Sequence, residues 1–131
     1  MACGGSSGLS KSAIDSKANA ICAAENSARD AIPQPSDLGD ATRAAAYFDR
    51  IEPVVVAATT KLSALKAASS VQNDWGAFFT LRQQETTLLQ TIRRKADAKD
   101  ASGLVDLKSE PPLGTKVDEA ATKVGATACA D

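Results

Sequence analysis

The feature that most constrains the fold of this chain is an apolar stripe that extends from residue 41 to residue 65. Apolar side chains recur there in pairs at heptad spacing, namely Ala41/Ala44, Phe48/Ile51, Val55/Ala58 and Leu62/Leu65. Such a repeat places all the pairs on one face of an α-helix, which must be buried against other helices. An isolated coiled coil is the alternative, but matching stripes elsewhere in the chain favour a bundle.

The expected limits of this helix follow from the residues around it. Ser36 or Asp37, directly after the Pro33-Gln34-Pro35 turn, can cap its first turn. Pro53 lies within the stripe and the apolar repeat continues beyond it, so we predict one helix kinked at Pro53 rather than two helices. About 30 residues in such a helix would span roughly 45 Å.

A second stripe predicts an earlier helix over residues 13–32. It consists of Ile14, Ala18, Ile21, Ala28 and Ile32. Ser10 is the expected N-cap, and Pro33 ends the helix because proline lacks an amide donor. Cys22 lies at the edge of the face that this helix should bury.

Two more helical segments follow residue 65. Ser69 or Ser70 can cap a helix that extends to about Lys99. Its apolar face carries Val71, Trp75, Phe78, Leu81, Leu88, Leu89, Ile92 and Ala96. The last segment is less regular: a short helical turn over residues 104–107, an interruption near Pro111-Pro112, and a further helix that ends before Gly125.

These segments together predict an all-α, four-helix up-down bundle. A chain of 131 residues suits one domain, and an aromatic content of 4% favours closely packed helices over a β-sandwich. We expect a single domain over residues 10–131, preceded by a flexible tether at residues 1–9.

The composition excludes several kinds of chemistry. The chain has no histidine, which removes Ser-His-Asp and Cys-His nucleophile systems, the usual di-iron bundle motif and most zinc sites. Its net charge of −1 does not suggest a nucleic-acid partner. No apolar run approaches the roughly 20 residues of a membrane span. We therefore expect no enzyme activity, no metal centre and no cofactor.

The three cysteines carry more information. Cys22 and Cys129 are expected to form a disulfide, which implies an oxidising compartment. Closing so long a loop should stabilise the fold by roughly 4–5 kcal/mol in the chain-entropy account. Two buried free thiols in a cytosolic protein are the alternative.

Cys3 lies in the sequence Cys-Gly-Gly-Ser-Ser-Gly, which looks like the mature start of a bacterial lipoprotein with Met1 placed ahead of it. The expected modification is a diacylglyceryl thioether on Cys3, which would hold the domain to a membrane. An incidental cysteine in a disordered tail is the alternative. We expect an extracytoplasmic protein that is anchored through Cys3.

From Leu9 onward the chain resembles a group of small secreted lipoproteins of high-GC Gram-positive bacteria. The matching features are Lys17-Ala-Asn-Ala-Ile-Cys22-Ala, the Ile32-Pro33-x-Pro35 turn, Ala46-Tyr47-Phe48 followed by Pro53, Asp74-Trp75 and the near-terminal Cys129. The resemblance implies a helical bundle, lipid anchoring at Cys3 and a Cys22–Cys129 bridge, but no specific activity. The Pro111-Pro112 pair departs from the uninterrupted last helix of such proteins.

Two glutamates fall on apolar helix faces. Glu25 lies among apolar positions of the first helix, and Glu85 lies near the centre of the apolar face of the third. A buried carboxylate must be paired, neutralised or bound to a cation, so the two could hold a hard cation, orient a cationic ligand or act as an acid/base pair. The alternative is local neutralisation by Arg82, three residues before Glu85, or by Arg29, four residues after Glu25.

Trp75 and Tyr47 could line a pocket or cap the core. We expect a non-enzymatic cell-envelope lipoprotein that acts as a structural or protein-interaction module. The alternative is an extracytoplasmic binding module for a small ligand or divalent cation near Glu25 and Glu85, with Arg82 and Trp75 beside them.

Overall fold

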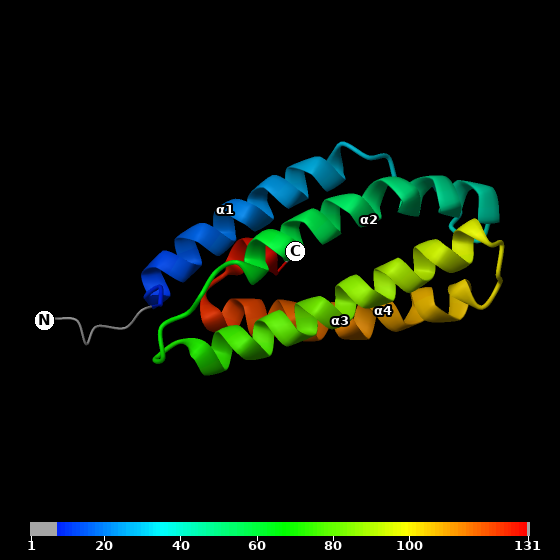
Figure 1. The fold of residues 1–131 in the computed structure, drawn as a ribbon. Coiled ribbons are helices and arrows are strands. Elements are labelled where there is room, and N and C mark those ends of the chain that lie inside the picture. The colour runs from blue at the N-terminus through cyan, green and yellow to red at the C-terminus, as the bar shows by residue number, and fades with distance from the viewer. Residues whose placement is uncertain (1–7, 131) are drawn as a thin grey trace, which may run out of the picture.

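A computed structural model describes residues 8–130 of the chain (Figure 1). It contains the helices α1 (Lys11–Asp30), α2 (Ala41–Ser63), α3 (Gln72–Asp97) and α4 (Gly103–Val124), and a short 3-10 helix, η1 (Thr127–Cys129). Successive long helices run in opposite directions (Figure 1). The prediction of an all-α, four-helix up-down bundle is therefore confirmed.

Helix α1 begins where the sequence predicts, because the Ser10 side chain accepts a hydrogen bond from the amide of Ala13 at 3.2 Å. Just before it, Leu9 exchanges backbone hydrogen bonds with the α2–α3 loop, donating to Lys66 and accepting from Ala68. A side chain at Gly8 would overlap the backbone of Ala67, so a glycine is needed for this close approach. The packed chain thus includes Leu9, which we expected in the tether.

Helix α2 begins later than predicted. Asp40, rather than Ser36 or Asp37, is its N-cap, and the Asp40 carboxylate accepts from the amides of Thr42 and Arg43. The Asp37 carboxylate instead accepts from the amide of Gly39 at 2.8 Å, which holds this segment in a turn. The helix continues through Pro53 as one element of 23 residues, as predicted, and spans roughly 35 Å.

Helix α3 begins at Gln72, and its N-cap is Val71 rather than Ser69 or Ser70. Val71 donates its amide to the carbonyl of Ala68 at 2.9 Å, so the serines lie in a turn before the helix. Burial of Val71 and Trp75 positions this first turn in place of a side-chain cap.

The predicted interruption of the last helix at Pro111-Pro112 is wrong. Helix α4 is continuous from Gly103 to Val124, with both prolines inside it. Both prolines are exposed, and α4 packs along α3 over its length, so tertiary packing holds the segments on either side of the prolines in one helix. Gly125 ends the helix in a left-handed conformation with φ of 93°, as its predicted position after the helix requires.

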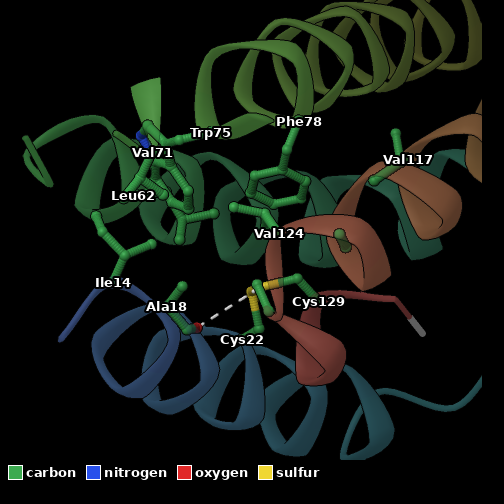
Figure 2. Packing of buried hydrophobic residues seen from close by; sticks show 12 residues of the cluster. Ile14, Ala18, Cys22, Leu62, Val71, Trp75, Phe78, Val117, Val124 and Cys129 are labelled. Carbon is green, nitrogen blue, oxygen red and sulfur yellow. Dashed lines mark hydrogen bonds between the residues drawn. A yellow bond between two sulfur atoms is a disulfide. The ribbon is translucent and has the colours of Figure 1, made fainter. Parts of the chain in front are cut away.

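The larger apolar core lies at the end of the bundle where the C-terminal segment returns (Figure 2). Its largest fully buried side chains are Phe78, Ile14, Leu62, Val117 and Val124. The predicted disulfide is present: Cys22 on α1 is bonded to Cys129 in η1, with their Cα atoms 5.0 Å apart. A smaller core of Ala44, Phe48 and Ile92 lies toward the other end.

The C-terminal segment takes the place of a direct contact between α1 and α4. Helix α1 packs against α2 and η1, η1 packs against α4, and α1 makes little contact with α4 itself. Asn19 accepts from the amide of Ala128 at 2.9 Å, and Asn26 donates to the carbonyl of Ala128 at 3.0 Å. Toward the Asp30 end of α1, no part of η1 lies between α1 and α4.

Over residues 8–130, none of the helices combines the length and apolar character needed to cross a membrane.

Candidate functional site

The structure separates the two glutamates that the sequence placed on apolar faces. Glu25 is 4% exposed and forms an ion pair with Arg82, which is 3% exposed. Arg82 also donates from Nε to the hydroxyl of Thr59 at 3.1 Å. Thr86 donates to the backbone carbonyl of Arg82, so the 2.9 Å contact between the two threonines is a hydrogen bond from Thr59 to Thr86.

This network connects α1, α2 and α3 and leaves Glu25 committed to Arg82. The neutralisation is not the local one considered from the sequence, since Arg82 pairs with a carboxylate on another helix rather than with Glu85. Glu25 and Glu85 line different hollows, and Glu25 is held by Arg82. We interpret Glu25, Arg82, Thr59 and Thr86 as a structural network.

Glu85 instead lines a cleft of about 250 Å³, which we call the α1–α4 cleft. Its polar lining residues are Arg29 on α1, Gln34 in the α1–α2 loop, Tyr47 on α2, Glu85 on α3 and Glu110 on α4. Its apolar lining comes from Leu38, Phe48, Ile51, Val55, Leu89 and Leu107. All four helices therefore contribute to the cleft, which lies where α1 and α4 are not joined by η1.

The cleft opens outward past α1 and the following loop. A shallower hollow shares Arg29, Gln34 and Tyr47 with the cleft and extends to Asn26 and Pro33. Arg29 and Tyr47 are half-buried and Gln34 is exposed, so these side chains form the entrance.

Two carboxyl groups meet inside the cleft. The carboxyl groups of Glu85 on α3 and Glu110 on α4 both line the cleft, close enough that Glu110 contributes to the raised pKa of Glu85. Gly114, one turn after Glu110, faces both: a Cβ there would lie 3.1 Å from Oε1 of Glu110 and 3.6 Å from Oε2 of Glu85. The absence of a side chain at Gly114 leaves space beside the carboxyl pair.

The environment raises the pKa of Glu85 to about 7. The largest cause is burial, which disfavours the ionised carboxylate. The negative charge of Glu110, and its ability to accept a hydrogen bond from protonated Glu85, raise the pKa further, whereas the charges of Arg82 and Arg29 lower it. Glu85 therefore changes its charge near neutral pH.

The remaining predicted site residues lie elsewhere or outside the described region. Trp75 is buried in the larger core, where its ring centroid is 5.3 Å from that of Phe78, and it does not line the α1–α4 cleft (Figure 2). Cys3 lies outside residues 8–130, so the lipid anchor stays a prediction. Tyr47, which could line a pocket or cap the core, does line the cleft.

The residues of the cleft do not form a typical binding site for a metal ion. Within residues 8–130 there is no cluster of three or more Cys, His, Asp or Glu side chains that could hold one. Calcium typically takes six to eight oxygen ligands. The cleft offers the carboxyl groups of Glu85 and Glu110, which are fewer acidic ligands than a calcium site normally uses.

The sequence reasoning missed Glu110 and Gly114, although a signal for both was present. Treating 103–124 as one helix places Glu110, Gly114, Val117 and Ala121 at spacings of four, three and four residues, which is one helix face. The expected interruption at Pro111-Pro112 separated Glu110 from this face, so its position opposite Glu85 was not predicted.

Comparison with protein-family models, with curated proteins and with solved structures finds no match to this chain. The function is therefore inferred from the chemistry of the α1–α4 cleft.

Proposed function

We propose that this protein is a non-enzymatic, extracytoplasmic binding module that holds a small organic cation in the α1–α4 cleft. The observation that carries the proposal is the Glu85–Glu110 carboxyl pair, which lies in a cleft with apolar walls and an open entrance. A pair of this kind is an acceptor for a primary ammonium group, which brings one positive charge and three donors.

The remaining lining defines the rest of the ligand. Aromatic and aliphatic side chains from α2, such as Phe48 and Val55, would contact an apolar body. Arg29 and Gln34 provide hydrogen-bond donors at the entrance, where a polar end of the ligand would lie. The volume of about 250 Å³ lies just below the roughly 300–1,000 Å³ common for ligand sites, so the ligand is small.

The cellular setting is part of the same proposal. The Cys22–Cys129 disulfide supports an oxidising compartment, because such bonds persist outside the cytoplasm. Lipidation of Cys3 would keep the binding module at the outer face of a membrane. The protein would therefore bind its ligand outside the cytoplasm.

A structural or protein-interaction role is the second candidate. One observation favours it: Leu104 and Val105 at the start of α4 are 42% and 66% exposed, beside an apolar hollow of about 120 Å³ that Leu104 also lines. Exposed apolar side chains next to a hollow are typical of contact surfaces.

The test is binding of n-butylammonium to the oxidised full-length chain, followed by NMR chemical-shift changes at pH 8. We expect saturable shifts at Glu85, Glu110 and Tyr47, and at least tenfold weaker binding in Glu85→Gln and Glu110→Gln. The matched control is Glu119→Gln on the exposed side of α4, which should bind as the unmodified chain does. 1-Butanol, which has the same alkyl chain without the charge, should bind more weakly. Equal binding of butanol, or no saturable shift with butylammonium, would reject the proposed function.

A further inference from the structure

The carboxyl groups of Glu85 and Glu110 lie close to each other in the α1–α4 cleft, both next to Gly114. Ionised carboxylates are acceptors only, so two carboxyl groups can be hydrogen-bonded to each other only when one of them is protonated. Two ionised carboxylates at such a distance would repel each other, because burial weakens the screening by water. Below about pH 7 the pair in the unliganded cleft therefore carries one proton and one negative charge.

The charged groups around the pair do not neutralise both carboxylates in place of the proton. Arg82 lies nearest to Glu85 on α3, but its guanidinium is committed to Glu25. From α1, Arg29 faces the pair at the entrance, and from α2 the titratable group that lines the cleft is Tyr47. From α4 the group is Glu110 itself.

We propose that the α1–α4 cleft exchanges a proton for its ligand: an ammonium group occupies the space beside Glu85 and Glu110 as the proton that they share leaves to solvent. This inference rests on the proposed function. Charge is conserved in this exchange. The pair changes from one negative charge to two, the ligand brings one positive charge, and one proton is released to solvent. Ligand binding is then linked to external pH.

Gly114 provides the space that this exchange needs. The ammonium group must approach both carboxylates, and the missing Cβ leaves room 3.1 Å from one and 3.6 Å from the other. In Gly114→Ala, the new methyl group would occupy this room, while alanine favours a helix over glycine. The variant should keep its fold and lose ligand binding.

The expected pH dependence has a definite sign. Below about pH 7 the pair holds the proton and the ligand must displace it, so affinity falls as pH falls. Above about pH 7 the pair is already ionised, and affinity becomes constant until the ligand amine itself loses its proton near pH 10.

The test is isothermal titration of the oxidised full-length chain with n-butylammonium at pH 6 and pH 8, each in two buffers that differ in ionisation enthalpy. We expect release of about 0.9 proton per ligand at pH 6 and about 0.1 at pH 8, with affinity about tenfold higher at pH 8. In Glu85→Gln the proton release at pH 6 should disappear, and Glu119→Gln should reproduce the unmodified chain.

The outcomes separate the two proposals. Binding that depends on Glu85, with no proton release at pH 6 and equal affinity at both pH values, would overturn the exchange and leave the proposed function standing. Binding that is unchanged in Gly114→Ala would overturn the placement of the ammonium beside Gly114. Absence of binding at both pH values would overturn the proposed function, and the exchange with it.

Discussion

At the residue scale, buried Glu25 and half-buried Glu85 differ in how their carboxyl groups are accommodated. Glu25 forms an ion pair with Arg82 inside the bundle, and Arg82 also donates a hydrogen bond to Thr59. Glu85 has no such dedicated partner, and its pKa rises to about 7 because burial and Glu110 disfavour the ionised form. One carboxyl group is therefore part of the scaffold, and the other lines the α1–α4 cleft, where we propose that the ligand binds.

The first prediction at this scale concerns Arg82→Met. The substitution leaves Glu25 buried without a countercharge, so we expect a loss of about 3–5 kcal/mol in the free energy of unfolding, measured by urea denaturation at pH 7. Arg93→Met is the matched control on the same helix, because Arg93 pairs with Asp49 and Glu52 at the surface and is 36% exposed. It should leave the free energy of unfolding almost unchanged, because exposed ion pairs contribute little. Equal losses in the two variants would contradict this role of Arg82.

The second prediction concerns the pH dependence of stability. The pKa of Glu85 is raised from 4.5 to about 7 by folding, so the folded state binds the proton more tightly than the unfolded state does. The contribution of Glu85 to stability is fully present below about pH 4.5 and is lost as pH rises to about 7.

In Glu85→Gln this loss is absent. The difference in unfolding free energy, variant minus unmodified chain, should therefore become more positive between pH 5 and pH 8 and stay constant above that range. Glu119→Gln should show no such change, because Glu119 is exposed. A flat difference for Glu85→Gln would mean that Glu85 titrates alike in both states.

At the element scale, α4 is the helix whose form depends most on its partners. Proline inside a helix removes a hydrogen bond and disfavours a helical conformation in the preceding residue. Pro111 and Pro112 nevertheless lie inside α4, because α3 packs along it on both sides of the prolines. This continuity places Glu110 and Gly114 on the same face, opposite Glu85.

The prediction at this scale is that Pro112→Ala stabilises the protein. The new amide can donate to the carbonyl of Lys108, four residues earlier, and removal of the ring relieves Pro111. We expect a gain of about 1–3 kcal/mol in the free energy of unfolding by urea denaturation. Since Pro112 is exposed, no core contact is lost. A destabilised variant would contradict a continuous α4 at this position.

At the scale of the whole molecule, the C-terminal segment determines where the bundle is closed and where it is open. η1 lies between α1 and α4, held by the Cys22–Cys129 bond and by Asn19 and Asn26. Past this segment α1 and α4 are not joined, and the α1–α4 cleft lies there.

The prediction at this scale is that the double variant Cys22→Ala, Cys129→Ala loses about 4–5 kcal/mol in the free energy of unfolding. The bond links residues 107 apart in sequence, so its removal gives the unfolded chain much more freedom. Cys3→Ser is the matched control and should leave the unfolding midpoint unchanged, since Cys22 and Cys129 are bonded to each other. A loss below about 1 kcal/mol would show that the bond contributes little beyond the packing of η1.

Much of this architecture could be predicted from local pattern. The heptad stripe over residues 41–65 predicted a continuous α2, and Ser10 predicted the start of α1. Helix starts at Ser36 and Ser69 were predicted wrongly, because serine, asparagine and aspartate favour turns as well as caps and the sequence does not distinguish the two.

The sequence by itself determined the all-helical class, predicted the Cys22–Cys129 pairing and placed Glu25 on an apolar helix face, since periodicity and the positions of cysteines are properties of the chain alone. Only the tertiary structure decided which carboxylate Arg82 neutralises, whether α4 passes through its prolines, and which group meets Glu85. The physical reason is that each of these depends on the distance between groups on different helices, and such distances arise only when the helices pack.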